Sequence, residues 1–191
     1  MKTKHQINLK KSVIFFGMAG VGKSSIGSDV SKHLNLSFFD TDKIIETKNG
    51  TRLSDLIENL GIDKFKALEA TTVIDCLGQN TVISPGGSFI YAEDQIKLIR
   101  HQAMFIYLYD EMSNILNRIP NLHTRGIIGL ENNSFEDLFN DRHQRYTSVC
   151  DVQLLTLRLT LIHHCGERPA PDPHAAQRVL VNRQFYTWIR A

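Results

Sequence analysis

The sequence predicts an α/β fold: a parallel sheet of about five strands that is flanked by helices on both faces. Two observations predict it. Short apolar runs alternate with longer amphipathic stretches, which is typical of strands joined by crossover helices. A glycine-rich segment also stands between the first apolar run and the first amphipathic stretch. In such a sheet ligands lie beyond the carboxyl ends of the strands, so polar residues at those ends are the candidates for function.

The apolar runs predict the strands, and the stretches between them predict the helices. The predicted strands are Ser12–Phe16, Ser37–Phe39, Thr81–Ser84, Met104–Tyr109 and Val152–Thr156. The predicted helices are Lys23–Leu34, Leu53–Leu60, Asp63–Leu77, Ala92–Arg100, Glu111–Ile119 and Phe135–Val149. The last helix has the clearest start, because Ser134 precedes Asp137 at the spacing of a capping box.

The glycine-rich segment from Gly17 to Ser24 matches the phosphate-binding pattern G-x-x-x-x-G-K-[ST] at every fixed position. Its glycines let successive N–H groups point into one concavity, and the following helix adds its positive end. Lys23 can then reach the β- and γ-phosphates, and the Ser24 hydroxyl can hold a magnesium ion. A glycine-rich turn without a ligand is the alternative, which the flanking strand and helix disfavour. We therefore expect a P-loop NTPase-type sheet that binds a nucleoside triphosphate through Gly17, Ala19, Gly20, Val21, Gly22, Lys23, Ser24 and Ser25.

Two carboxylates follow the second predicted strand. Asp40 and Asp42 can serve different ligands there, one facing magnesium and the other a substrate hydroxyl. The alternative is that Asp40 or Thr41 only caps a following helix. Asp40 lies one helix and one short strand after Lys23, as a compact βαβ unit requires, and this spacing favours the functional interpretation.

Six short motifs follow one another between residues 13 and 151. They are the phosphate loop with Ser25-Ile26-Gly27, Phe39-Asp40-Thr41-Asp42, Phe65-Lys66-Ala67-Leu68-Glu69, Ser84-Pro85-Gly86-Gly87-Ser88, Thr124-Arg125-Gly126-Ile127-Ile128, and Arg142 four residues before Tyr146. In this order the motifs resemble those of the shikimate kinase family. The resemblance implies a nucleoside-monophosphate-kinase-like fold, with ATP and Mg²⁺ as cofactors.

The resemblance also implies a role for each residue of the motifs. Asp42 would accept the proton of the attacking hydroxyl, while Lys23 and Arg125 would neutralise charge on the transferring phosphoryl group. Arg118 would lie against the adenine. The metal would be held by Ser24 and Asp40. The substrate would be bound by Asp42, Lys66, Gly86, Gly87 and Arg142, with Glu69 orienting Lys66 from one helical turn away.

The sequence departs from the family pattern near the substrate. Lys66 stands where the family has arginine, and an ammonium cannot grip a carboxylate through two parallel hydrogen bonds. Ser88 replaces a third glycine and adds a side chain where the backbone is expected to approach the ligand. Gly126 replaces the proline after Arg125, and His143–Arg145 replaces apolar and proline residues before Tyr146. The identity of the acceptor therefore stays open.

The predicted activity is ATP-dependent phosphorylation of a hydroxyl on a small acidic metabolite. By resemblance the foremost reaction converts shikimate to shikimate 3-phosphate, in aromatic amino-acid biosynthesis. The alternatives are a diverged kinase for another small polyol or hydroxy acid, and a nucleotide-binding module that has lost transfer activity. The Asp40-Thr41-Asp42 motif with Gly86 and Gly87 disfavours gluconate kinases and nucleoside monophosphate kinases.

Length and composition predict one kinase domain over residues 1–157, with a lid over about 120–133 and a tail over 158–191. The tail is either a terminal helix or a segment from an altered reading frame or an expression vector. A net charge of +2 gives no argument for nucleic acid as a partner. Three separated cysteines and the lack of a long apolar run predict a cytoplasmic protein without a membrane partner, and we expect a monomer.

Overall fold

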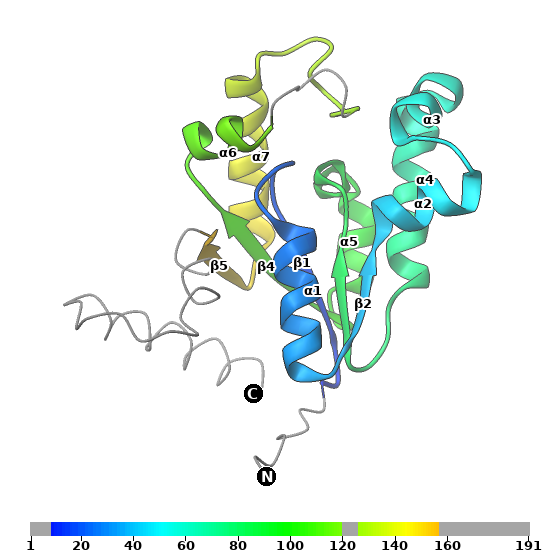
Figure 1. The fold of residues 1–191 in the computed structure, drawn as a ribbon, viewed down its shortest axis with the longest axis vertical. Coiled ribbons are helices and arrows are strands. Elements are labelled where there is room, and N and C mark those ends of the chain that lie inside the picture. The colour runs from blue at the N-terminus through cyan, green and yellow to red at the C-terminus, as the bar shows by residue number, and fades with distance from the viewer. Residues whose placement is uncertain (1–8, 120–125, 157–191) are drawn as a thin grey trace, which may run out of the picture.

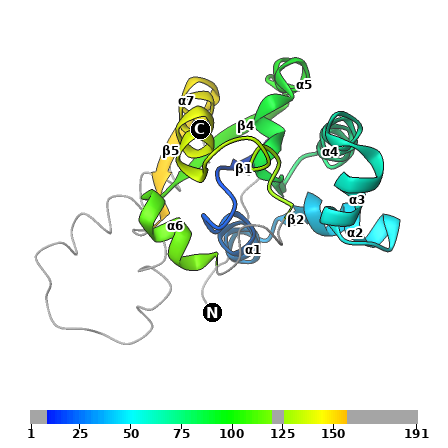
Figure 2. The ribbon, with the colours of Figure 1, turned by 90° about the horizontal axis from the view of Figure 1, so that it is seen from above.

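The computed structural model describes residues 9–119 and 126–156, and Figure 1 shows their arrangement. One parallel sheet of five strands has the order β2-β3-β1-β4-β5. The strands are β1 (Ser12–Phe16), β2 (Ser37–Asp40), β3 (Thr81–Ser84), β4 (Ala103–Tyr109) and β5 (Val152–Leu155). Figure 2 shows α5 and α7 on one side of the sheet and α1 and α6 on the other. The predicted fold class is confirmed.

The helices are α1 (Lys23–Leu34), α2 (Thr41–Asn49), α3 (Leu53–Leu60), α4 (Ile62–Asp75), α5 (Glu93–Ile99), α6 (Met112–Arg118) and α7 (Phe135–Val149), with a 3₁₀ helix η1 (Gly87–Tyr91) after β3. Every predicted strand and helix agrees with its observed bounds to within two residues. Two observed elements were not in the predicted set, namely α2 and η1. A helix at the position of α2 is expected only in the alternative that Asp40 or Thr41 caps it. The predicted tail and Arg125 lie outside the described residues.

The central strands are buried on both faces of the sheet. Every residue of β1 is buried, and its neighbour β4 is buried at five of its seven positions. Phe16 of β1 packs edge-on against Phe105 of β4, with ring centres 5.7 Å apart, and against Tyr146 of α7 at 5.1 Å. Burial on both faces explains why these strands read as continuous apolar runs rather than alternating ones.

A second, smaller hydrophobic cluster lies away from the sheet. Ile45 of α2, Leu56 of α3, Phe65 of α4 and Ile128 form its buried centre. Figure 2 shows α2, α3 and α4 grouped beyond β2. The cluster therefore attaches Ile128, which belongs to the predicted lid segment, to these three helices.

Two helices begin at side chains that cap them. The Ser134 hydroxyl accepts a hydrogen bond from the Asp137 N–H at 3.0 Å, as the capping-box spacing predicts. Asp40 accepts from the Lys43 N–H at 3.3 Å and so caps α2. The capping interpretation of Asp40 is thus correct, and it does not exclude a second role for the same carboxylate.

Candidate active site

A cavity of about 600 Å³ opens beyond the carboxyl ends of the strands. The residues that line it come from the loop before α1 and the first turn of that helix, the start of α2 and of α3, the segment after β3, residues 126–128, and helices α4, α6 and α7. Twelve of the predicted site residues line it: Ala19, Gly20, Gly22, Lys23, Ser24, Ser25, Asp40, Asp42, Gly86, Gly87, Arg118 and Arg142. The fold thus brings side chains from distant parts of the sequence to one space.

Glycine is required in the phosphate loop for steric reasons. At Gly17, with φ 150°, a Cβ would overlap the carbonyl oxygen of Leu108 on the neighbouring strand β4. At Gly20, with φ 79°, a Cβ would lie 2.6 Å from the Ile119 side chain. The loop is therefore pressed against β4 and the end of α6, and side chains at these positions would push it out of place.

Lys23, the first residue of α1, turns back onto the loop. Its ammonium donates hydrogen bonds to the carbonyl oxygens of Gly17 at 3.0 Å and Met18 at 3.1 Å. Burial lowers the pKa of Lys23 to about 8, and the Asp42 carboxylate opposes this effect. The ammonium therefore lies in a partly desolvated position, close to the carboxylates at the start of α2.

Asp42, in the first turn of α2, faces the glycines that follow β3. An ideal Cβ on Gly86 would lie 2.8 Å from Asp42 Oδ1, and it would overlap Glu69 Oε1. A Cβ on Gly87 would lie 2.7 Å from Nη1 of Arg142. The two glycines therefore leave room for carboxylate and guanidinium groups to meet the backbone at one edge of the cavity.

Arg142 is a buried cation, since its side chain on α7 is only 1% exposed. Its Nη2 donates to the Ile128 carbonyl at 2.8 Å, and its Nε donates to the Tyr91 hydroxyl at 3.4 Å. Nη1 lies beside Gly87 at the cavity. A buried guanidinium held in this way offers a fixed site for an anionic group.

The sequence matches the family model for shikimate kinase over residues 19–161, three quarters of the chain. The chain belongs to the shikimate kinase family. A shikimate kinase of Staphylococcus aureus strain MSSA476 is 30% identical over 158 residues, which cover 78% of this chain and 88% of the relative. The shikimate kinase of strain JH9 matches at the same identity and coverage.

Solved shikimate kinases share the fold. The enzyme from Acinetobacter baumannii, solved in complex with shikimate, has a TM-score of 0.70 at 18% identity and covers 96% of this chain and 95% of its own. The enzyme from Aquifex aeolicus has a TM-score of 0.64 at 21% identity, covering 93% and 98%. The chain thus spans nearly the full length of these family members.

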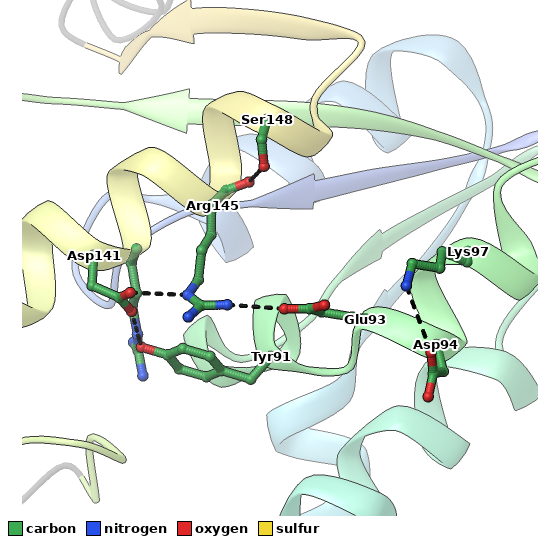
Figure 3. A network of polar contacts seen from close by, with 8 residues as sticks. Tyr91, Glu93, Asp94, Lys97, Asp141, Arg145 and Ser148 are labelled. Atoms are coloured by element: carbon green, nitrogen blue, oxygen red, sulfur yellow. Dashed lines mark hydrogen bonds and ion pairs between the residues drawn. The ribbon is translucent and has the colours of Figure 1, made fainter.

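Lys66, at the family's arginine position, is not among the residues that line the cavity. Its ammonium lies 5.1 Å from the centre of the Tyr91 ring, a cation–π distance. The hydroxyl of this tyrosine donates to Asp141 at 2.8 Å, and Arg145 joins Asp141 to Glu93 (Figure 3). The arginine that replaces an apolar or proline residue of the family thus takes part in the network around Tyr91.

Glu69 does not orient Lys66, contrary to expectation. One of its oxygens, Oε2, accepts from the Ser88 hydroxyl at 2.6 Å, and the other, Oε1, has no hydrogen-bond partner among the residues that the structure describes. Burial, with the nearby Asp42 carboxylate adding to it, raises the pKa of Glu69 to about 7, while the Ser88 hydrogen bond works in the opposite direction. Ser88, expected to crowd the site, turns its side chain to this carboxyl instead.

Glu69→Gln is expected to stabilise the ligand-free protein progressively as the pH rises. Below pH 4.5, the ordinary pKa of the group, the carboxyl is protonated in the folded and the unfolded chain. Between pH 4.5 and about 7 the unfolded chain ionises first, so the wild-type fold loses about 3 kcal/mol of stability that the amide keeps. Urea unfolding of both proteins from pH 4.5 to 8 measures this. A difference in unfolding free energy that stays constant with pH contradicts the prediction.

Asp110, which holds the cavity residue Arg118, is a buried residue that sequence reasoning missed. It directly follows β4, is fully buried, and accepts hydrogen bonds from Arg118, Asn114 and Thr156. Burial works to raise the pKa of Asp110, but its hydrogen bonds outweigh this effect and hold the pKa below its ordinary value. Its place at a strand end, where polar residues carry function in such sheets, was the signal that could have identified it.

Asp110→Asn is expected to raise the KM for ATP by about tenfold, the factor that corresponds to one charge-assisted hydrogen bond. The change removes the charge that holds Arg118 at the cavity, so the KM for the acceptor should stay within about twofold. Steady-state kinetics with each substrate varied measure this split. Asp151→Asn is the matched control, because Asp151 pairs with Arg100 away from the cavity. Equal changes in both KM values contradict a nucleotide-side role.

The described part of the predicted lid lies against the cavity. Gly126, Ile127 and Ile128 line it, and the two isoleucines are buried. The Ile128 carbonyl accepts a hydrogen bond from Arg142, while the Ile128 side chain packs in the cluster with α2, α3 and α4.

In the described ranges, no helix is both long and apolar enough to cross a membrane.

Proposed function

We propose that the chain is an ATP-dependent shikimate kinase that forms shikimate 3-phosphate. Membership of the shikimate kinase family supports this proposal. The observation that carries it is the placement of Lys23, Asp42 and Arg142 around one cavity at the strand ends, with Gly86 and Gly87 between them. This cavity offers a phosphate loop, a base and an anion site together.

In the proposed reaction, Asp42 accepts a hydrogen bond from the shikimate hydroxyl and takes its proton as the hydroxyl oxygen bonds to the γ-phosphorus. The bond from the γ-phosphorus to the β,γ-bridging oxygen breaks, and ADP leaves with that oxygen. Lys23, with Arg125 as the second cation, balances the charge on the transferring group. Catalysis of phosphoryl transfer depends mainly on positioning and charge stabilisation by the protein, which these groups can supply.

Arg142 is the group to which we assign the shikimate carboxylate. It is buried, its planar fork suits a carboxylate, and Nη1 lies beside Gly87. Lys66, held over Tyr91, can add longer-range attraction without lining the cavity. On the nucleotide side, we assign the loop residues Gly17 to Ser25 to the phosphates and Arg118 to the adenine.

We assign the magnesium ion to Ser24 and Asp40. Both residues line the cavity and offer hard oxygen donors, which is the chemistry that Mg²⁺ prefers. Within the described residues, no group of three His, Cys, Asp or Glu side chains gathers as a metal site. This fits Mg²⁺, which keeps several waters and uses phosphate oxygens instead of a complete protein cage. When bound, the ion would supply positive charge that neutralises the phosphates during transfer.

The compartment, the oligomeric state and the partners of the protein are also part of the proposal. We propose a cytoplasmic, monomeric protein that acts on a small molecule and binds no nucleic acid. Free thiols at Cys76 and Cys150 support a reducing compartment. Light scattering of the purified protein tests the monomer, and a gel-shift assay tests nucleic-acid binding.

The deciding experiment measures ADP release from MgATP by the purified full chain, with and without shikimate. We expect saturable stimulation by shikimate and phosphate incorporation into it. The departures at Lys66 and Ser88 favour a second candidate, a kinase for another small polyol or hydroxy acid. A panel of such acceptors tests it. Stimulation by a different acceptor alone overturns shikimate as the substrate, and ATP binding without any stimulation overturns the kinase.

A further inference from the structure

Ser88 and Glu69 form a buried pair at the edge of the cavity. Ser88 lies on η1, directly after Gly86 and Gly87, and Glu69 lies on α4. Their side chains are almost fully inaccessible, at 7% and 1% exposure, and the hydroxyl donates to Glu69 Oε2 at 2.6 Å. Such a short bond between buried groups fixes the orientation of the carboxyl.

The second oxygen of this carboxyl has no hydrogen-bond partner within residues 9–119 and 126–156. Glu69 Oε1 accepts no hydrogen bond in the described structure, although the residue lines the cavity. Buried polar atoms in proteins are almost always hydrogen-bonded, so an exception at a cavity indicates a group supplied by a ligand. Glu69 Oε1 and Asp42 Oδ1 both lie against Gly86, because a Cβ on that residue would overlap the first and lie 2.8 Å from the second, so the two oxygens are close together. A ligand with two adjacent donors could therefore reach both oxygens at once.

Resting on the proposed function, we propose that Ser88 is a positioning and specificity residue for the acceptor. It fixes Glu69 through Oε2 and thereby presents Oε1 to the acceptor hydroxyl next to the one that Asp42 binds. Asp42 takes the attacking hydroxyl, and Glu69 takes its neighbour. The site therefore selects an acid with two adjacent hydroxyls over one with a single hydroxyl.

The choice of serine as the partner of Glu69 has a physical reason. Lys66 does not reach this carboxyl, because its ammonium lies over Tyr91. A neutral hydroxyl holds the carboxyl in place without forming an ion pair that would compete with the ligand for its charge. A site built to hydrogen-bond a substrate hydroxyl also rejects analogues that lack it, because its own buried group is then left unpaired.

Ser88→Ala tests this assignment through the acceptor. We expect the KM for shikimate to rise by about tenfold, with kcat and the KM for ATP within about twofold of the wild-type values. The KM for a shikimate analogue that lacks the hydroxyl next to the phosphorylated one should stay within about twofold. A merely structural defect would not distinguish these two acceptors.

Two further variants complete the experiment. Ser31→Ala is the matched control, because Ser31 is also buried but donates only to the Ser28 carbonyl within α1. It should change neither KM. In a Glu69→Ala background, Ser88→Ala should have no further effect on the KM for shikimate, since the two residues act as one unit.

The outcomes separate this proposal from the proposed function. If the wild-type protein phosphorylates shikimate and Ser88→Ala has an unchanged KM for shikimate, the proposed role of Ser88 is wrong. The proposed kinase activity is then unaffected. Equal rises in the KM for shikimate and for the deoxy analogue also overturn the role of Ser88. A wild-type protein that does not phosphorylate shikimate overturns the proposed function, and the role of Ser88 falls with it.

Discussion

Lys23→Ala is expected to lower kcat for phosphoryl transfer by about a thousandfold. The ammonium is the cation at the centre of the phosphate loop, and in this structure loop carbonyl oxygens accept its hydrogen bonds. A γ-phosphate in the loop would be a charged acceptor for the same donors. Alanine leaves the charge that develops on the transferring group without this counter-charge, at a position that burial partly desolvates.

The kinetics of Lys23→Ala are measured as ADP release at saturating MgATP and shikimate. Lys32→Ala is the matched control, because Lys32 is an exposed lysine on the same helix outside the cavity. Thermal unfolding of both variants shows whether the fold is kept. Activity near the wild-type level in a folded Lys23→Ala protein would show that the phosphate-loop assignment is wrong.

Asp42→Asn is expected to lower kcat by between about a hundredfold and ten thousandfold, the range for losing a general base. An amide oxygen can still accept a hydrogen bond from the hydroxyl, but it cannot take the proton. The KM for shikimate should therefore change much less than kcat. This split separates a base from a residue that only binds the acceptor.

A control for this variant exists on another helix. Asp63 occupies the first turn of α4 as Asp42 occupies the first turn of α2, and it is exposed. Asp63→Asn therefore removes the same charge from the same helical position without touching the cavity. If both substitutions left kcat unchanged, another group would have to accept the proton.

Much of the fold follows from local sequence patterns. The apolar runs of β1 and β4 predict strands buried on both faces, and the observed sheet buries them in this way. Gly17 and Gly22 were predictable because the phosphate-loop pattern fixes glycine at both positions. The capping box at Ser134 locates the start of α7. These features depend on residues that are near one another in the sequence.

The partners of individual side chains were not predictable in the same way. Ser88 and Glu69 lie 19 residues apart, and only the packing of η1 against α4 brings them together. The Asp110 and Thr156 side chains meet across 46 residues because β4 and β5 are adjacent in the sheet. The Lys66 ammonium lies over the ring of Tyr91, a residue that belongs to η1 and not to the helix of Lys66. Spacing along the chain carries no information about such tertiary contacts.

The cap at Asp40 has a consequence for engineering this enzyme. Asp40 and Ser134 both start helices, and replacing such a cap by alanine costs about 1 kcal/mol. Asp40 also lines the cavity, whereas Ser134 does not. With the proposed role of Asp40 as a metal ligand, a library that varies residue 40 mixes losses of expression with losses of turnover, and the two cannot be optimised independently there. A change at Ser134, by contrast, alters the stability of α7 without altering the cavity.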